Sequence, residues 1–462
     1  MREESAASGG EACRGSRLQK PFHKFFQGGN YILLDVCSGG VHVVDEEIYN
    51  ALDSDDYTDT PEYAELLEAG LFKGGDDYEE YADLNVDAPL KSMCLHVSHD
   101  CNLRCAYCFA EDVVDERGIM SVETAKRAVD FLIANSKDRE HLEMDFFGGE
   151  PLLAWETIKE AVSYSKQEGA RLGKQFKFTV TTNGVLLDDE KIAFINAEMS
   201  NVVLSLDGRR EVNDRMRGKG VFERVLPKFR KLVESRTKEG FTDYFIRGTY
   251  TSYNLDFADD VLAIANEGFK YISIEPVTVK PDVPFALLPE HLLRIKNEYD
   301  RLFEIAQNNN DWTFFHFHID LHNTPCILKR LRGCGAGNEY IAVAPDGNIF
   351  PCHRYAGIDK WKMGNINNVG AHIARPDIKG YFSKTHIYAK EKCRSCWARF
   401  YCGGGCNAEF FLFEGDACKP SEVFCEWFKK RTECAIALAV YTDSNLNLTN
   451  YITNYSQEGE YQ

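Results

Sequence analysis

The distribution of cysteine constrains this chain more than any other feature of its sequence. Sixteen cysteines occur among 462 residues, and most gather in one group at 94–108 and a second at 326–434. The N-terminus, MREESAASGG, lacks the apolar core of a secretory signal, and thiols in the cytosol stay reduced. Disulfides therefore fit the pattern poorly, and metal or iron–sulfur ligation is the better interpretation.

Composition and charge exclude several classes of protein. Hydrophobic residues make up 44% of the chain, and its length suggests about three domains with cores of their own. No run of eighteen apolar residues occurs, which argues against a membrane span. The formal net charge of −19 argues against a nucleic-acid-binding surface. We expect a cytoplasmic protein with no membrane or nucleic-acid partner.

The hydrophobic pattern divides the chain into an N-terminal α+β unit, a central α/β region and an irregular C-terminal region. The segment HKFFQGGNYILLDVCSGGVHVVD at 23–45 predicts short strands, and the stretches EEIYNAL and PEYAELLEAGLF predict two helices. The expected segments are a disordered tail at 1–20, the α+β unit at 21–85, the α/β region at 90–285, a helical bridge at 286–325, the cysteine-rich region at 326–435 and a C-terminal tail at 436–462.

Six apolar segments of the central region predict strands, and amphipathic helical segments separate them. One such helix is SVETAKRAVDFLIAN, which Ser121 opens as a capping residue. Six strand–helix repeats imply a parallel sheet, either doubly wound or a partial barrel. In both architectures the functional site lies at the carboxyl ends of the strands. The predicted strands are 94–98, 142–147, 176–182, 201–206, 244–251 and 271–277.

The first cysteine group follows the first predicted strand directly. Cys101, Cys105 and Cys108 lie on one short segment. Three thiolates could hold three irons of a four-iron cluster and leave the fourth iron open, unlike an electron-transfer site, in which four cysteines occupy every iron. A zinc site completed by His99 is the alternative. Cys94 and Cys434 lie in apolar segments, which predicts core positions for both.

Small polar residues and glycines end the next three strands. The motifs are FFGGEP at 146–151, TTNG at 181–184 and SLDG at 205–208. Glycine at such positions lets the backbone approach a ligand closely. Together with Tyr107 before the last cysteine, this Cys-x3-Cys-x2-Cys motif resembles the signature of radical S-adenosylmethionine (SAM) enzymes.

The resemblance implies a cofactor and a set of cofactor contacts. In that family SAM chelates the open iron, and an electron from the cluster cleaves SAM to methionine and a 5′-deoxyadenosyl radical. Arg217 and Arg247 could pair with the SAM carboxylate, although ion pairing within the scaffold is an equal alternative. The implied SAM-binding residues are Tyr107, Gly148, Gly149, Glu150, Pro151, Asn183, Ser205, Asp207 and Arg217.

The second cysteine group resembles the SPASM domain, which houses two auxiliary four-iron clusters. Its spacing is Cys-x12-Gly-x4-Cys, then Cys-x2-Cys-x5-Cys-x3-Cys, then one further cysteine. By this resemblance Cys393, Cys396, Cys402 and Cys425 hold an outer cluster, and Cys334, Cys352 and Cys406 hold an inner one. Either Cys326 or a substrate thiolate completes the inner cluster. Three 4Fe–4S clusters and SAM are thus the implied cofactors, and zinc ribbons are the alternative for this region.

The sequence around these motifs is similar to that of SCIFF-peptide maturases, which form thioether crosslinks between a peptide cysteine sulfur and a carbon of another residue. Segments such as MCLHVSHDCNLRCAYCFA and ARFYCGGGC carry the similarity. It implies a partial (β/α)6 barrel, an N-terminal winged-helix-like unit that recognises a leader peptide, and a C-terminal SPASM domain. The implied partners are a Cys-rich precursor peptide with its leader and an electron donor such as ferredoxin or flavodoxin.

Two other functions remain open at this point. An anaerobic sulfatase maturase would share the SAM core and both auxiliary clusters but would not be expected to carry the 21–85 unit. A zinc-stapled peptide-binding scaffold would need no SAM motif. No side chain is assigned as catalytic. His99, His316, His318 and His353 are candidate bases, although histidines of this kind are more often structural.

Overall fold

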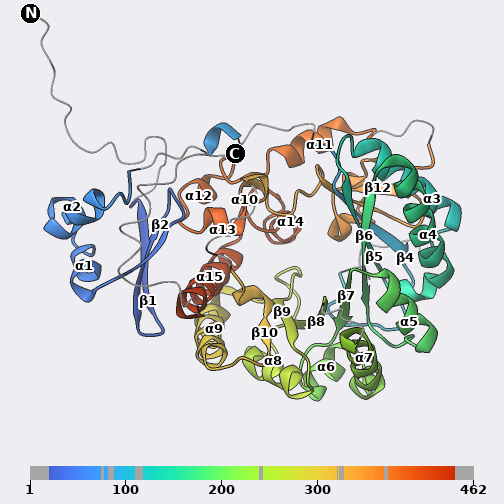
Figure 1. Cartoon of the computed structure of the whole chain (residues 1–462), viewed down its shortest axis with the longest axis horizontal. Coiled ribbons are helices and arrows are strands. Elements are labelled where there is room, and N and C mark those ends of the chain that lie inside the picture. Colours follow the sequence, from blue (N-terminus) through green and yellow to red (C-terminus); the bar gives the residue numbers. More distant parts are fainter. Residues whose placement is uncertain are drawn as a thin grey trace, which may run out of the picture.

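The computed structural model describes residues 20–73, 78–81, 88–109, 118–238, 243–319, 321, 327–368 and 373–442 (Figure 1). Nearly all of the expected tail at 1–20 lies outside these ranges, as do Cys326 and residues 443–462. The described chain forms one long curved sheet, a small N-terminal unit beside it, and a C-terminal region that joins the two.

The N-terminal unit has the predicted three strands and two helices. β1 (Phe22–Gln27), β2 (Asn30–Asp35) and β3 (Val41–Val44) form an antiparallel sheet, and α1 (Glu46–Ala51) and α2 (Pro61–Glu68) follow it. Thr60 caps α2 by accepting the Tyr63 N–H, with Pro61 as the first helical residue. A small apolar core of its own holds the unit together and contains Phe22, Leu33, Leu52, Tyr63, Leu66, Leu71 and Phe72.

The central sheet confirms the six predicted strands and their parallel order. Each strand is hydrogen-bonded to the next one along the chain, which is the order of a barrel and not of a doubly wound sheet. The strands are β4 (Ser92–Ser98), β5 (His141–Gly148), β6 (Gln175–Thr182), β7 (Asn201–Ser205), β8 (Tyr244–Tyr250) and β9 (Tyr271–Pro276).

Helices cover the convex face of this sheet, as Figure 1 shows. The sheet does not close, because β9 pairs with the two-residue β10 (Thr313–Phe314) at one edge. The expected helical bridge is therefore a helix followed by this edge strand. The helices are α3 (Val122–Asn135), α4 (Trp155–Leu172), α5 (Asp189–Glu198), α6 (Arg210–Arg217), α7 (Val221–Lys238), α8 (Phe257–Asn266) and α9 (Leu292–Gln307).

The C-terminal region is more regular than the sequence predicts, because its first part extends the sheet. β11 (Tyr340–Val343) pairs in parallel with β4, and β12 (Asn348–Phe350) and β13 (Gly364–Asn365) continue from it. The apolar residues of β11 become buried by this pairing. The short helices that follow are α11 (Pro376–Ser383), α12 (Glu391–Arg394), α13 (Arg399–Cys402) and α14 (Asn407–Glu414), and α10 (Ile327–Arg332) precedes them.

The last helix corrects the expected C-terminal tail. α15 (Glu422–Thr442) runs six residues past position 436, where we expect the tail to begin. Its AIALAV segment is buried against α9 and the turn at Phe315–Phe317, so hydrophobic burial extends the helix. Cys434 is fully buried there, as predicted. Within the described ranges, none of the helices combines the length and apolarity that crossing a lipid bilayer requires.

Candidate active site

A cavity of about 520 Å³ lies on the concave side of the sheet. Strand residues alternate between the two faces, and those of β4 show the result: Met93, Leu95 and Val97 pack into the core, whereas Cys94 lines the cavity. Cys94 is therefore buried as predicted, but it is not simply a core residue. The cavity lies among the ends of the parallel strands, where the sequence predicts the site.

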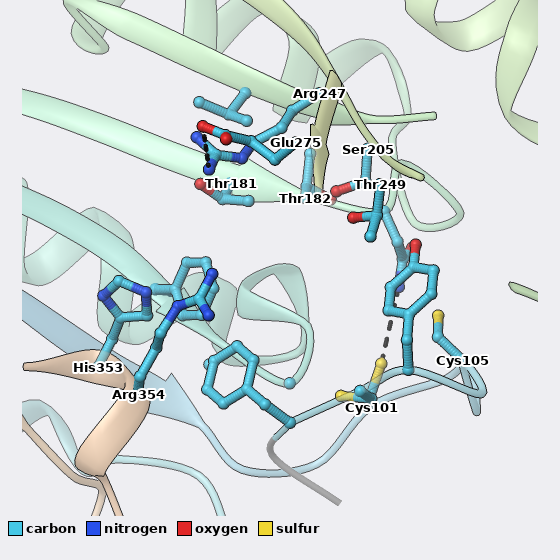
Figure 2. A pocket seen from close by; sticks show the side chains of 18 of the residues that line it. Cys101, Cys105, Thr181, Thr182, Ser205, Arg247, Thr249, Glu275, His353 and Arg354 are labelled. Atoms are coloured by element: carbon cyan, nitrogen blue, oxygen red, sulfur yellow. Dashed lines mark hydrogen bonds and ion pairs between the residues drawn. The ribbon is translucent and has the colours of Figure 1, made fainter. Parts of the chain in front are cut away.

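The cysteine loop forms one wall of this cavity. Cys101, Cys105 and Cys108 all line it, and Figure 2 shows the first two side by side. Cys101 Sγ accepts the Leu103 N–H at 3.4 Å and lies 3.8 Å from Asn183 Nδ2. The loop is therefore joined both to its own backbone and to the end of β6.

Burial opposes ionisation of two thiols of the loop, Cys101 and Cys105. Burial raises the pKa of Cys101, and it raises that of Cys105 to about 12 although Arg217 opposes the shift. Metal ligation is what would favour their thiolate forms. In the part of the chain that the structure describes, no three His, Cys, Asp or Glu side chains surround one metal-ion position. A four-iron cluster binds each thiolate on a different iron, so it fits this wall better than zinc.

The two glycines after β5 permit a close approach between backbones. A Cβ atom at Gly148, which has a φ of +128°, would lie 2.1 Å from Ser98 O, and one at Gly149 would lie 2.3 Å from Asp100 O. Gly149 N–H instead donates to Ser98 O at 2.7 Å. Both glycines also line the cavity. Their first role is thus to pack the end of β5 against the start of the cysteine loop.

Glu150 joins the ends of β5 and β6. Its carboxylate is fully buried and accepts hydrogen bonds from Leu152 N at 3.1 Å, Thr182 Oγ1 at 2.7 Å and Asn183 N at 2.8 Å. Burial raises its pKa to about 7, against these hydrogen bonds. Glu150 and Pro151 are not among the residues that line the cavity, so the structure gives this carboxylate a positioning role, and its contact with SAM stays a prediction.

Asp207 organises two residues of the cavity wall without lining it. Its carboxylate accepts from Tyr107 OH at 2.7 Å and from Arg217 Nη2 at 2.9 Å, and it also binds the Thr249 N–H. Arg217 is thus ion-paired within the scaffold. Its Nε is buried and has no hydrogen-bond partner in the described chain, so an unused donor remains beside the cavity. An anionic ligand group, such as the carboxylate of SAM, suits that donor.

A carboxylate that the sequence pattern did not single out, Glu275, lies on the far side of the cavity beside Arg247 and His316, which were sequence candidates. Glu275 Oε1 lies 3.4 Å from Arg247 Nη2, and Arg431 and His316 also reach the carboxylate. Burial raises the pKa of Glu275, but these surrounding groups outweigh burial and hold it at about 2. The only sequence signal for this residue is its place at the end of the sixth predicted strand.

His353 and Arg354 bring the C-terminal region into the same cavity. Figure 2 shows them across from Cys101 and Cys105, and it shows Ser205 and Thr249 of the strand ends on the cysteine side. Tyr340 OH and His353 Nδ1 lie 2.9 Å apart. The predicted cofactor residues Asn183 and Ser205 line the cavity as well. His353 and Arg354 follow Cys352 directly, so the cavity lies between the two cysteine groups.

The C-terminal cysteines fall into two electrostatic sets. Burial raises the pKa of Cys352, and Cys334 and Cys406 raise it further. Burial likewise raises the pKa of Cys402, and Cys393, Cys396 and Cys425 add to it. The resemblance to the SPASM domain implies the same grouping, and the assignment of these cysteines as inner and outer cluster ligands stays a prediction. Cys326, the possible fourth inner ligand, lies outside the described residues.

Comparisons with known proteins support both halves of the site. A family model described as the radical SAM superfamily matches residues 95–247, and a model of the SPASM iron–sulfur cluster-binding domain matches residues 334–397. The chain therefore carries both predicted domains, and these domains imply SAM and 4Fe–4S clusters as cofactors.

Individual relatives differ in how much of the chain they cover. A cysteine-type anaerobic sulfatase-maturating enzyme of Clostridium perfringens is 25% identical over 78% of this chain and 99% of its own length. Radical SAM cyclopropyl synthase TigE of Paramaledivibacter caminithermalis is 24% identical over 87% of this chain and 91% of its own length. The structure of Streptococcus suis SuiB bound to precursor peptide SuiA superposes with a TM-score of 0.53, 16% identity and coverage of 88% and 99%.

Proposed function

We propose that this radical SAM protein with a SPASM domain, a peptide-modifying enzyme, forms intramolecular Cys thioether crosslinks in a ribosomally made Cys-rich precursor peptide. The observation that carries the proposal is the N-terminal unit. It is an α+β element with a small apolar core of its own, it packs against the cysteine-rich region, and none of its described residues lines the cavity. A leader-guided peptide substrate gives this unit a purpose.

The chain's cysteines divide the cofactors between the two sides of the cavity. Cys101, Cys105 and Cys108 would hold the cluster that binds SAM, and the two C-terminal sets would hold auxiliary clusters. When bound, SAM and its cluster supply a 5′-deoxyadenosyl radical that removes a hydrogen atom from the acceptor residue. The chain itself positions the reactants: Asp207 fixes Tyr107 and Arg217, and Glu150 fixes the strand ends.

The N-terminal unit has an edge at which a leader peptide could add as a strand. The sheet order is β1–β2–β3, so β3 has a neighbour on one side only within the described sheet. The opposite edge faces the C-terminal region. His23 Nε2 of β1 lies 2.8 Å from Glu433 Oε1, and the His23 ring stacks on Trp397 with ring centroids 3.8 Å apart. Trp397 follows Cys396, so the recognition unit rests beside the outer ligand set.

The cavity between the two cysteine groups is where a reacting peptide segment would meet SAM. Its volume of about 520 Å³ and its mixture of strand-end hydroxyls and charged groups suit a polar ligand. Arg247, Glu275 and Arg354 lie on the side away from the cysteine loop. They would orient the peptide there, while the inner ligand set lies next to His353 and Arg354.

Formation of formylglycine, as in the sulfatase-maturating relative, is the second candidate. Identity of 25% to that enzyme favours it. Against it stands coverage: the relative uses 99% of its own length and matches 78% of this chain, whereas TigE matches 87% and SuiB 88%. The additional coverage is what a protein with an N-terminal recognition unit would show, and it favours a peptide maturase. The two domain matches disfavour a zinc-stapled scaffold. A colourless preparation, which would lack the absorbance of iron–sulfur clusters, would favour that scaffold again.

Mass spectrometry of a turnover reaction tests the proposal. Anaerobically reconstituted enzyme receives SAM, dithionite and a leader-bearing Cys-rich peptide, and the product is reduced and alkylated. A thioether removes two hydrogens and one alkylatable thiol, and it survives the reductant. An aldehyde that reacts with a hydrazide would favour formylglycine instead. The matched controls are a Cys→Ser peptide and the Cys105→Ala enzyme, neither of which should give product.

A further inference from the structure

A buried lysine lies between the two C-terminal ligand sets. Lys390 precedes α12, and 1% of its surface is exposed. Lysine is rarely buried to this extent unless its charge is paired or fully hydrogen-bonded. No step of the proposed reaction uses this side chain, so its burial requires another explanation.

Oxygen atoms hold the ammonium group in one place. Lys390 Nζ donates to Gly404 O at 2.7 Å and to Asn407 Oδ1 at 2.8 Å, and it lies 4.9 Å from the centre of the Phe410 ring. Asn407 Nδ2 donates to Thr385 Oγ1 at 3.0 Å, which turns the amide oxygen towards the lysine. Both oxygens are acceptors for a charged ammonium group, which has three donors and no acceptor.

The glycines between Cys402 and Cys406 make this arrangement possible. Gly404 has a φ of +87°, a conformation that L side chains rarely adopt. The turn places its carbonyl on Nζ, and a Cβ atom at Gly404 would lie 3.5 Å from that nitrogen. The CGGGC segment thus binds the lysine through the Gly404 carbonyl, and it contains one cysteine of each ligand set.

The charge of Lys390 acts on both sets. Gly404, which accepts its hydrogen bond, lies between Cys402 of the outer set and Cys406 of the inner set, and Cys393 of the outer set is three residues after the lysine. Burial lowers the pKa of Lys390, and cysteines of both sets, Cys393, Cys402 and Cys406, oppose that shift. Other cations reach one set each: Arg354 acts on Cys352, and Lys429 acts on Cys396 and Cys425. Within the described chain, Lys390 is the cation shared by the two.

We propose that Lys390 is a fixed positive charge that raises the reduction potential of both auxiliary clusters. A four-iron cluster with thiolate ligands is anionic, and reduction adds a further negative charge. A cation held in a water-poor interior stabilises the reduced form more strongly than the oxidised form. The proposal rests on the cluster assignment and not on the peptide reaction. Lys390 would thus help the auxiliary clusters to take up electrons.

The test is a potentiometric titration followed by electron paramagnetic resonance, in enzyme that also carries Cys101→Ala, Cys105→Ala and Cys108→Ala. Only the auxiliary clusters then give signals, and no peptide is needed. Lys390→Gln removes the charge and keeps a polar side chain. Lys390→Arg keeps a cation. Lys392→Gln is the control, because this lysine of α12 is exposed and solvent screens its charge, although that charge reaches Cys425 of the outer set.

We expect Lys390→Gln to retain its iron and to shift the auxiliary midpoints to more negative potential. Lys390→Arg should stay near the parent value, and Lys392→Gln should not move. A fully loaded Lys390→Gln enzyme with unshifted midpoints would overturn the proposal, as would an equal shift in Lys392→Gln. If the Gln variant loses iron, Lys390→Met is measured in the same way. Iron loss there too would make Lys390 a structural residue and end the proposal.

Discussion

The two cysteine regions of this protein stand on different kinds of support. The loop at 101–108 follows the end of a buried parallel strand, and backbone hydrogen bonds from Gly149 and Glu150 to Ser98 and Asp100 fix the residues directly before it. The C-terminal cysteines lie on four-residue helices, on turns and at helix ends. Glycines 403–405 all have positive φ there, and the Gly404 carbonyl accepts a hydrogen bond from Lys390.

This difference indicates what each region needs in order to fold. The sheet beneath the first loop has a continuous apolar core, so its strands do not depend on metal. Helices of four residues are far too short to be stable alone, and the apolar cluster beside α12 contains four buried residues. We infer that metal ligation contributes folding energy mainly in the C-terminal region.

Replacing a cysteine of the first loop tests its half of the comparison and should have the largest effect. Cys105→Ala should reduce SAM cleavage to the level seen without enzyme, because one of three ligands to the first cluster is lost. The melting temperature should barely change, since the strand remains intact. Chromatography of 5′-deoxyadenosine and a thermal scan measure the two effects. If the variant still produced 5′-deoxyadenosine, the assignment of the SAM cluster would be wrong.

The same change in the second region should give the reverse pattern. Cys393→Ala should lower the melting temperature and increase amide hydrogen exchange across α12 and α13, because the outer ligand set holds these short helices together. SAM cleavage without peptide should persist. Cys434→Ala, a buried cysteine outside both sets, controls for the loss of a thiol. Unchanged exchange in Cys393→Ala would refute a folding role for the outer set.

A buried ion pair near the first loop should be worth more than a half-exposed one. Asp207→Asn leaves the Arg217 charge without its partner in a buried site, so we expect a loss of about 3 kcal/mol in unfolding free energy and weaker SAM binding. Asp256→Asn, which breaks the more exposed pair with Arg209, should cost about 1 kcal/mol. Urea unfolding and SAM titration measure both. Equal losses of unfolding free energy in the two variants would contradict the prediction that the more buried ion pair contributes more to stability.

Glu150 should make stability depend on pH. Its folded-state pKa is about 7, above the ordinary value of 4.5, so the folded state binds more protons than the unfolded state between these values. Stability therefore falls as the pH rises from about 4.5 to 7, by roughly 3 kcal/mol for this group. Urea unfolding of cluster-free protein at pH 5 and 7.5 should show the fall, and Glu150→Gln should show less of it. A variant as pH-sensitive as the parent would assign the effect to Asp145 or Glu409, whose pKa values burial also raises.

The smallest effect belongs to the contact between the N-terminal unit and the C-terminal region. His23→Ala removes the stacking on Trp397 and the hydrogen bond to Glu433, which should weaken docking by about 1 kcal/mol. Limited proteolysis in the 74–88 segment should become faster, while SAM cleavage without peptide stays at the parent rate. The exposed residue Phe26 lies in the same strand, and Phe26→Ala should leave proteolysis unchanged.

Local patterns in the sequence were sufficient for the strands and the first cysteine group. The six strands follow from apolar runs, and Cys101 to Cys108 from spacing alone. The sheet extension by β11 was missed, because pairing between Tyr340 and Ser92 joins segments almost 250 positions apart. Glu275, Arg354 and Lys390 were missed for a related reason: a charged residue shows its importance only once the fold has buried it. The GGEP motif identified Glu150, but its hydrogen bonds to Thr182 and Asn183 could not be predicted from the sequence.

Because β11 is hydrogen-bonded along β4, the boundary between the SAM-binding half and the auxiliary half runs through a single sheet. The two halves are therefore not exchangeable cassettes. In a truncated protein that ended before Tyr340, β4 would become an edge strand with unpaired backbone groups. Such an edge tends to pair with strands of other molecules. The strand that leads into Cys101 would then also lose its lateral support. Grafting this auxiliary region onto another barrel would require transplanting a strand register as well as seven cysteines.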